Sequence, residues 1–244
     1  MVKIQEEPQN IFNNYLTEHL SYTIDPKSRQ KKKQWLKSNY HNILPEDLNA
    51  KILEVGPGHG ELLEFLIQDM SYNNVTGVDI SAEVVDFCNK ILPNSTNLVN
   101  SDFKYFTDRP NTFDCIMMLH VLEHIPKSQT HELLKALYQS LKPGGLMVVE
   151  VPNMANPLVG INFRYADFTH EVGFTDASLR YVLLRAGFSK ISVHPSRVPT
   201  NSPARIIHSL LRSIVDTVLS IIIKVYIPSS KQIMSTAIYA ILIK

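Results

Sequence analysis

The sequence is poor in the features that mark several classes of protein. It has only two cysteines, Cys88 and Cys115, in 244 residues, so it lacks a disulfide framework and a reducing cytoplasm is the simplest setting. Its formal charge is only +1, which favours neither a nucleic-acid nor an acidic partner. The N-terminus has no apolar stretch typical of a signal peptide, and we find no internal repeat. The remaining composition, 44% hydrophobic and 19% charged, is that of one well-buried globular domain.

From residue 51 onward, short apolar runs alternate with stretches of helical spacing. This alternation predicts a parallel β-sheet covered by helices on both faces. We expect strands near residues 51–55, 74–78, 96–100, 113–118, 145–151, 190–195 and 236–243. Before residue 51 the sequence is polar, with helical stretches expected near 11–20 and 28–40. Because ligands of such sheets bind outside the carboxyl ends of the strands, residues that follow each strand are candidates for a site.

The leading segment contains the most basic part of the chain. Its cations are Lys27, Arg29, Lys31, Lys32, Lys33 and Lys37. We interpret them as a solvated helix face with Trp35 packed on the domain, because the net charge elsewhere does not reinforce the patch. A nucleic-acid or anionic-lipid patch is the alternative, and no nucleic-acid partner is expected.

Three glycines at alternate positions, Gly56, Gly58 and Gly60, separate the first expected strand from a helical stretch. Glycine is needed where a ligand approaches the backbone closely or where the turn requires positive φ. The spacing differs from the G-x-G-x-x-G fingerprint of dinucleotide sites, and the carboxylate of Glu54 suits a cationic ligand better than a pyrophosphate. Asp79 closes the next strand, where such folds place the carboxylate that binds a ribose diol.

This order of strand, glycine loop, helix, strand and acid resembles the class I S-adenosylmethionine (SAM) dependent methyltransferases, whose first motif is matched by Leu53-Glu54-Val55-Gly56-x-Gly58-x-Gly60. The resemblance implies a Rossmann-like α/β fold with a seven-stranded, mostly parallel sheet, helices on both faces and an antiparallel last strand beside the fifth. It implies SAM as cofactor and S-adenosylhomocysteine as product. It also implies a helical cap, residues 1–50, over the cofactor pocket of a methyltransferase domain, residues 51–244. The implied cofactor-binding residues are Glu54, Gly56, Gly58, Gly60, Asp79, Ile80, Asp102, Phe103, Leu119 and His120.

Asp102 follows the third expected strand and has two compatible interpretations. The resemblance implies that it accepts a hydrogen bond from the adenine amino group, with the backbone of Phe103 nearby. Asp is also among the best residues for capping a helix N-terminus, which is the structural alternative.

The segment after the fourth expected strand contains His120, Glu123 and His124. If the chain turns helical at His120, these side chains share one face and form three sides of a metal site. The same spacing occurs in reversed zinc-protease motifs, but here it follows a strand of the sheet that carries the glycine loop. It is similar to the E-x-x-E-H of ubiquinone-pathway and small-RNA 2′-O-methyltransferases, which implies a divalent metal held with a later histidine. His120 in place of the first Glu favours zinc, manganese or iron over magnesium. The alternative is that Glu123 and His124 orient substrate or brace the loop.

A long segment without obvious secondary structure follows the fifth expected strand, to about residue 169, and loops of this length are usually lids or binding loops. His170 follows directly and is the candidate general base or fourth metal ligand, beside His124 and Glu123 as catalytic candidates; a surface or helix-entry role is the alternative. A helix is expected over residues 176–187, with Thr175 as its N-cap. The block of residues 164–175, together with residues 120–126, resembles methyltransferases found among bacterial surface-polysaccharide and other glycan-modifying enzymes.

An apolar insert of helical spacing, residues 203–230, separates the last two expected strands. His208, Arg212, Asp216 and Lys224 interrupt it, and its longest uncharged stretch is shorter than a membrane span of about 20 residues. Packing on the domain core or in a homodimer, through residues 206–227, is favoured because wide apolar faces are usually buried in protein. The alternative is a place in a membrane interface, which would put the protein at the inner face of the membrane.

The sequence therefore predicts a cytoplasmic methyltransferase that moves a methyl group from SAM to an oxygen of a sugar, glycan or glycan precursor, with a small-molecule or glycan acceptor. The rival within enzymes is O-methylation of a small aromatic or other secondary metabolite. The rival from another class is a SAM-binding scaffold protein without catalysis.

Overall fold

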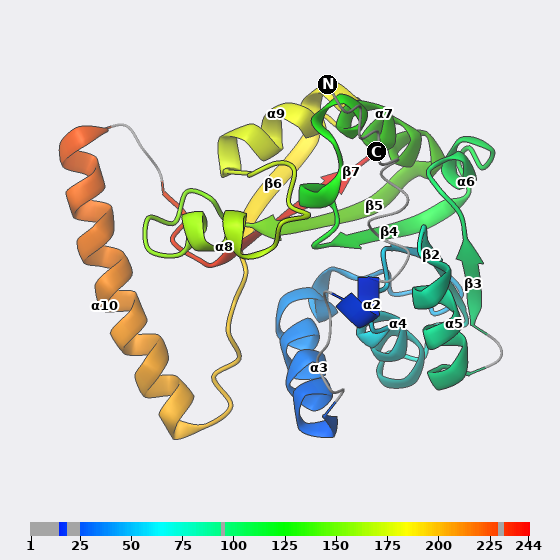
Figure 1. The fold of residues 1–244 in the computed structure, drawn as a ribbon, viewed down its shortest axis with the longest axis horizontal. Coiled ribbons are helices and arrows are strands. Elements are labelled where there is room, and N and C mark those ends of the chain that lie inside the picture. Colours follow the sequence, from blue (N-terminus) through cyan, green and yellow to red (C-terminus); the bar gives the residue numbers. More distant parts are fainter. Residues whose placement is uncertain (1–14, 19–24, 94–95, 229–231) are drawn as a thin grey trace, which may run out of the picture.

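The computed structural model describes the chain except for residues 1–14, 19–24, 94–95 and 229–231. It contains a seven-stranded sheet of order β3-β2-β1-β4-β5-β7-β6, flanked by helices above and below (Figure 1). The strands are β1 (Lys51–Val55), β2 (Asn74–Asp79), β3 (Asn97–Asn100), β4 (Phe113–Leu119), β5 (Leu141–Pro152), β6 (Lys190–Pro195) and β7 (Ala237–Ile243). All seven predicted strands are confirmed, with ends that differ by a few residues.

The longer helices alternate with these strands along the chain. They are α3 (Pro26–Tyr40), α5 (Ala82–Ile91), α7 (Lys127–Ser140), α9 (Asp176–Ala186) and α10 (Pro203–Tyr226). The short helical segments are α2 (Tyr15–Glu18), η1 (His41–Ile43), α4 (Glu61–Glu64), η2 (Phe65–Asp69), α6 (Lys104–Thr107), η3 (Leu122–His124) and α8 (Gly160–Ala166). The helix expected over 11–20 lies mostly outside the described residues, and only α2 of it is seen.

Two hydrophobic cores lie on opposite faces of the sheet, because side chains alternate along each strand. On β4, Ile116 and Met118 pack into the core beneath α7 and α9. Their neighbours Cys115 and Met117 pack into the other core, with α3, α4 and α5. These two helix layers lie above and below the sheet in Figure 1. Residues 115–118 of β4 are all buried, which is what a central strand covered on both faces requires.

The last strand is antiparallel, as predicted. β7 pairs with β5 and with β6, both antiparallel, while the other neighbouring pairs are parallel. The edge strand β6 is therefore joined to the sheet through β7 alone. The mostly parallel Rossmann-like architecture is confirmed.

Three expectations about the C-terminal half were wrong. The fifth strand, expected to begin near residue 145, already pairs Leu141 with Phe113, and Gly144 lies inside it with positive φ. The segment expected to lack secondary structure contains α8. The insert forms one continuous helix, α10, and none of its residues is buried in the structure, so packing on the domain's own core is excluded. Figure 1 shows α10 beside the body of the protein instead of within it.

Candidate active site

The site is a cavity of about 1270 Å³ at the carboxyl ends of β1, β2, β4 and β5. It is larger than the roughly 300–1,000 Å³ common for ligand pockets, so it has room for a cofactor and an acceptor together. The predicted residues that line it are Glu54, Gly56, Gly58, Asp79, Ile80, Asp102, Phe103, Leu119, His120, Glu123, His124 and His170. Gly60 lies outside this lining and begins α4.

The glycine loop after β1 requires glycine for two physical reasons. Gly56, Gly58 and Gly60 all have left-handed backbone conformations, with φ of 72°, 52° and 70°, which other residues adopt at a cost. A Cβ on Gly56 would also lie 2.4 Å from Cγ2 of Val121. The loop can therefore adopt this conformation beside the cavity only because its three glycines have no Cβ.

Two carboxyl groups border this loop. Glu54 is buried, one of its oxygens has no hydrogen-bond partner among the described residues, and burial, with the charges of Glu61 and Asp79, raises its pKa well above the usual value. Such a group is stabilised by a cationic ligand, which fits the sulfonium and ammonium groups of SAM. Burial likewise raises the pKa of Asp79 to about 6, although backbone N–H groups of Ser81, Gly58 and Ile80 oppose the shift.

Asp102 lies one residue before the N-cap of α6, which is Phe103, and its side chain both accepts a hydrogen bond at the start of that helix and lines the cavity. Its Oδ1 accepts a hydrogen bond from the backbone N–H of Lys104, at 2.9 Å, in the first turn of α6. Phe103 lies beside it in the cavity wall. The two interpretations of Asp102 made from sequence are thus compatible in the structure.

His120 is held between two buried carboxylates. Its Nε2 lies 2.8 Å from Oε1 of Glu150, and its Nδ1 lies 3.3 Å from Oε1 of Glu123. Burial lowers the pKa of His120, but Glu123 and Glu150 outweigh it and raise that pKa to about 9. His120 is therefore an imidazolium at neutral pH, and both of its ring nitrogens are engaged.

This geometry corrects one expectation about His120. The residue has a left-handed φ of 57° and precedes the short helix η3, which begins at Leu122, so it does not share a helix face with Glu123 and His124. In this structure His120 pairs with Glu123 and Glu150 and lies outside the cluster formed by Glu123, His124 and His170.

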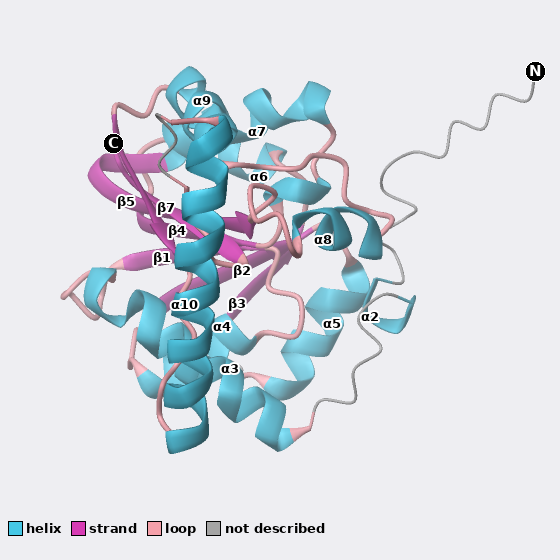
Figure 2. Cartoon of the chain, turned by 90° about the vertical axis from the view of Figure 1, so that its left-hand side faces the viewer, coloured by secondary structure: helices cyan, strands magenta, loops and turns pink. Residues whose placement is uncertain are grey.

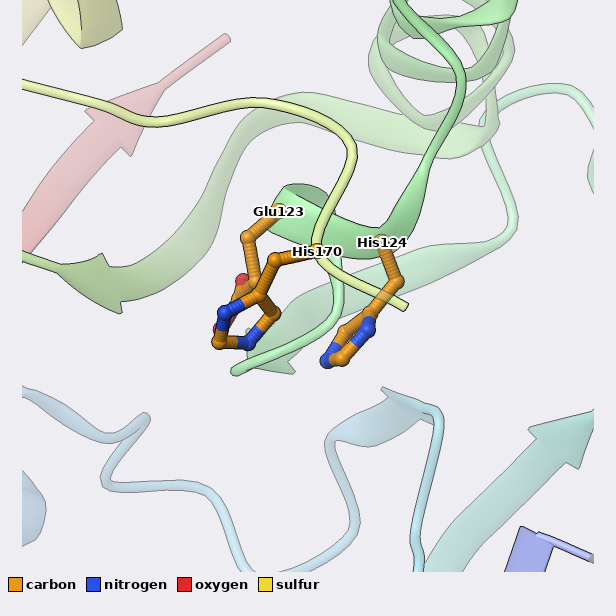
Figure 3. Close-up of side chains that lie close together, drawn as sticks. All are labelled: Glu123, His124 and His170. Carbon is orange, nitrogen blue, oxygen red and sulfur yellow. The ribbon is translucent and has the colours of Figure 1, made fainter. Parts of the chain in front are cut away.

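The remaining three candidates meet in one cluster, which Figure 3 shows. One possible ligand atom from each of Glu123, His124 and His170 lies within 4.8 Å of the other two, and the two imidazole rings have centroids 4.7 Å apart. Glu123 is 1% exposed, and its Oε1 has the ion-pair contact with Nδ1 of His120 at 3.3 Å, while neither of its oxygens accepts a hydrogen bond of good geometry among the described residues. A buried carboxylate beside two imidazoles is a donor set that fits a divalent cation of the zinc, manganese or iron type.

Hydrogen bonds outside the cluster fix the tautomers of both histidines. Nδ1 of His170 lies 2.7 Å from the carbonyl oxygen of Phe163, so this nitrogen carries the proton. The hydroxyl of Thr169 donates to Asp167 at 2.6 Å and so accepts from Nδ1 of His124 at 2.8 Å. In the neutral form of each ring the lone pair is then on Nε2. Burial also lowers the pKa of His124, which favours the neutral form of this ring.

Sequence reasoning missed the partners that support this site. Glu150 is completely buried near the end of β5, and it accepts a hydrogen bond from the hydroxyl of Tyr40 in α3. An acid inside an otherwise apolar strand was the available signal for Glu150. The resemblance had implied a helical cap from this part of the chain, and α3 contributes Lys32, Trp35 and Leu36 to the cavity wall.

Comparison with known proteins agrees with this architecture. The sequence profile described as "Methyltransferase domain" matches residues 28–193. A trans-aconitate 2-methyltransferase from Rhodopseudomonas palustris (strain BisB18) is 24% identical over 73% of this chain and 68% of its own length. A SAM-dependent methyltransferase structure from Archaeoglobus fulgidus has a TM-score of 0.66 at 24% identity, with 88% of this chain and 94% of that chain covered. A SAM-dependent, possible histamine N-methyltransferase from Thermotoga maritima has a TM-score of 0.65 at 14% identity, covering 97% and 99%.

The sheet order, the glycine loop and the cavity at the strand ends define a Rossmann-like methyltransferase, for which SAM is the cofactor. The sequence match covers well over half of the chain, and this protein belongs to the methyltransferase domain family. It is a SAM-dependent methyltransferase.

Proposed function

We propose that the protein transfers the methyl group of SAM to a hydroxyl oxygen, with a sugar or glycan hydroxyl as the first candidate acceptor. The observation that supports this proposal is the pair of histidines, His124 and His170, whose ring centroids lie 4.7 Å apart and which both line the cavity. The bound cofactor supplies a methyl group already activated by its sulfonium. What the chain must add is alignment of the acceptor oxygen and removal of its proton.

At the cofactor end of the cavity, three groups of residues are proposed to contact three parts of SAM. Glu54 lies beside the glycine loop, where a positive charge would offset the cost of burying its carboxylate. Asp79 is placed for a ribose diol, and Asp102 with Phe103 for adenine, as in other sheets of this topology. The α3 segment completes the wall, which supports the assignment of residues 1–50 as a cap over the cofactor.

The charges at the acceptor end favour a neutral hydroxyl over an anionic acceptor. Glu123, Glu150 and Asp167 bring three carboxylates to this region, and His120 is the imidazolium that balances them in part. Hydrogen bonds from Thr169 outweigh the effect of burial and hold the pKa of Asp167 below its usual range. An anionic acceptor would therefore be repelled by the negative charge that His120 leaves uncompensated in this region. A sugar hydroxyl has a high pKa and benefits from a base, so a histidine pair is well matched to it.

A divalent metal is a second route to the same proton. Glu123, His124 and His170 would hold the ion, and the hydrogen bonds from both Nδ1 atoms would orient the rings as they do in many metal sites. A bound cation there would lower the pKa of the acceptor hydroxyl and would offset the negative charge of Glu123.

The test is methyl transfer to a panel of acceptors, followed as formation of S-adenosylhomocysteine. The panel contains neutral sugars, nucleotide sugars, phenols and trans-aconitate, with and without a chelator and added Zn²⁺, Mn²⁺ or Mg²⁺. We expect turnover with a hydroxyl acceptor and a fall of about 10²- to 10⁴-fold in kcat for His170→Asn, with unchanged affinity for SAM.

His131→Asn is the matched control, because His131 lies exposed on α7 outside the cavity lining. Equal rates for the two variants would remove His170 from catalysis. SAM binding without turnover on any acceptor would favour the scaffold alternative, and turnover on phenols alone would favour the aromatic-metabolite alternative.

Methylation of a carboxylate is the second candidate, because the relative from Rhodopseudomonas palustris is named a trans-aconitate 2-methyltransferase. A carboxylate acceptor needs no base. Under this alternative His170→Asn would leave kcat nearly unchanged, and turnover would appear with trans-aconitate in the panel.

A further inference from the structure

The helix α10 presents its apolar side away from the protein. Its exposed apolar side chains occupy about half of the helix circumference, because at 3.6 residues per turn they repeat on one side. They are Ile206, Ile207, Leu210, Leu211, Ile214, Val215, Val218, Ile221, Ile222 and Val225. In Figure 2, which views the molecule from the side of α10, the helix stands in front of the rest of the chain.

The opposite side of α10 is the one turned toward the protein. Arg205, Arg212, Asp216, Leu219 and Ile223 are partly covered there. Arg212 donates to the carbonyl oxygen of Met234, at 3.5 Å, in the segment that leads into β7. Arg212 also pairs with Asp216 at 3.7 Å. A helix that packed on its own domain would bury the apolar side, so this orientation leaves the apolar side for something outside the domain.

We propose that α10 lies flat on a lipid bilayer, with its apolar side inserted among the upper acyl chains. A helix of 24 residues is about 36 Å long and gives a continuous apolar strip. A half-circumference of large aliphatic side chains opposite a polar side is the pattern of interfacial helices.

Crossing the bilayer is incompatible with the connections of α10, although the helix is long and apolar enough for it. The chain leaves the sheet at the end of β6 and returns at the start of β7, where Pro195 pairs with Ile238 and the backbone N–H of Ser196 donates to Ala237. Both ends of α10 are therefore tied to one place in one folded domain. Helix ends tied in this way lie on the same side of a membrane.

A second copy of the chain covers this surface less well than lipid does. A pair of packed helices buries a stripe roughly 100° wide, which would leave the margins of the apolar side in water. Lipid fills the whole apolar side without further contacts.

The charges of α10 favour an anionic lipid surface. Arg212 is paired with Asp216 on the side turned toward the protein, which leaves Arg205 and the exposed Lys224 as the net positive charge of the helix. Lys224 and the exposed Tyr226 lie at its C-terminal end, where a cation and an aromatic ring reach the headgroup layer. The start of α10 is linked to the basic helix α3 through a hydrogen bond from Asn201 to Gln34, so the cations of α3 lie nearby.

A second exposed apolar segment lies on the same side of the molecule. Ile161 and Tyr165 of α8 are each 76% exposed, and Phe168 directly after it is completely exposed. α8 and α10 share the left-hand side of Figure 1. Phe163 and Asp167, from the same segment, line the cavity, so a bilayer on this side would approach the acceptor end of the site.

Vesicle flotation of the full-length protein tests this proposal. The vesicles are phosphatidylcholine alone or phosphatidylcholine with phosphatidylglycerol. The test variant is Leu210→Glu with Ile214→Glu on the apolar side, and the matched control is Ser209→Glu with Ser213→Glu, one residue earlier and also exposed. Both pairs add the same charge at the same spacing, so their difference reports apolar burial alone.

We expect the wild type to float with phosphatidylglycerol vesicles and to be released as salt is raised. The Leu210/Ile214 variant should lose at least about tenfold in partitioning, because two aliphatic side chains no longer enter the bilayer. The Ser209/Ser213 control should still bind the vesicles, with affinity reduced only by its two added negative charges. Circular dichroism and SAM affinity check that both variants fold.

Three outcomes would overturn the proposal. They are no flotation of the wild type, equal loss in the two variants, and a wild-type dimer in light scattering that only the Leu210/Ile214 variant dissociates, without vesicle binding. The last would assign α10 to a second copy of the chain. None of them depends on the identity of the acceptor.

Discussion

Adding one methyl group at Gly56 tests whether the cofactor loop is fixed by backbone conformation, by close contact, or by both. The alanine in Gly56→Ala must adopt φ near 72°, which costs about 1–2 kcal/mol in a left-handed conformation. Its Cβ would also lie 2.4 Å from Cγ2 of Val121. Val121 is β-branched and stiff at χ1, so relieving this overlap costs a further 1–3 kcal/mol or so. We expect a total loss of about 2–5 kcal/mol in the free energy of unfolding.

Gly144 offers a control with the same backbone conformation and no contact. Its φ is 75°, and a Cβ there would meet no atom within 4 Å. Gly144→Ala should therefore cost only the conformational part, about 1–2 kcal/mol, and should leave SAM binding unchanged. Gly56→Ala should weaken SAM binding as well, because Val121 lines the cavity next to His120.

A double-mutant cycle separates the two contributions. Val121→Ala removes the methyl group that Gly56→Ala would strike, so the double variant should recover at least about 1 kcal/mol relative to additivity. Urea unfolding measures the stabilities, and calorimetric titration measures SAM affinity. Equal losses at Gly56 and Gly144, or strict additivity with Val121→Ala, would show that the close contact has no energetic role.

The pH dependence gives further predictions. SAM affinity should fall as pH drops through about 6, because protonated Asp79 no longer accepts hydrogen bonds from the ribose hydroxyls. Asp79→Asn should bind SAM weakly at every pH. If this variant showed the same pH dependence of SAM affinity as the wild type in calorimetric titrations, Asp79 would not be the group that titrates. The raised pKa of His120 adds stability that is fully present below about 6.5 and is lost as pH rises through about 9. Glu150→Gln should flatten this alkaline loss in thermal unfolding, and persistence of the loss would assign it to another group. Thr175→Ala should destabilise the protein by about 1 kcal/mol in urea unfolding, since its hydroxyl caps α9 in a capping box.

The candidate site could be predicted from sequence where its residues are close in the chain. Glu123 and His124 are adjacent, and the motif marked both as a pair. His170 was predicted to act with them because it is a histidine at the end of a long loop, and the structure brings all three residues together. His120 was misplaced, because its neighbours along the chain suggested a shared helix face.

The role of His120 depends on Glu150, which is 30 residues away and hydrogen-bonded at 2.8 Å. That contact exists because β4 and β5 are parallel neighbours in a register that places Leu119 beside Glu150. Strand register is a property of the assembled sheet, and so no local pattern could assign His120 to a carboxylate pair.

The sequence by itself determined the order of strands and helices, the glycine loop and the acids at or near the ends of β1, β2 and β3. These are local: glycine permits left-handed backbone, and short continuous apolar runs form strands covered on both faces. Only the tertiary structure decided which histidines meet, which nitrogen carries each proton, and which way α10 faces. These features depend on contacts between residues far apart in the chain. The residue that each side chain meets in the folded protein decides its role, and the spacing along the sequence does not.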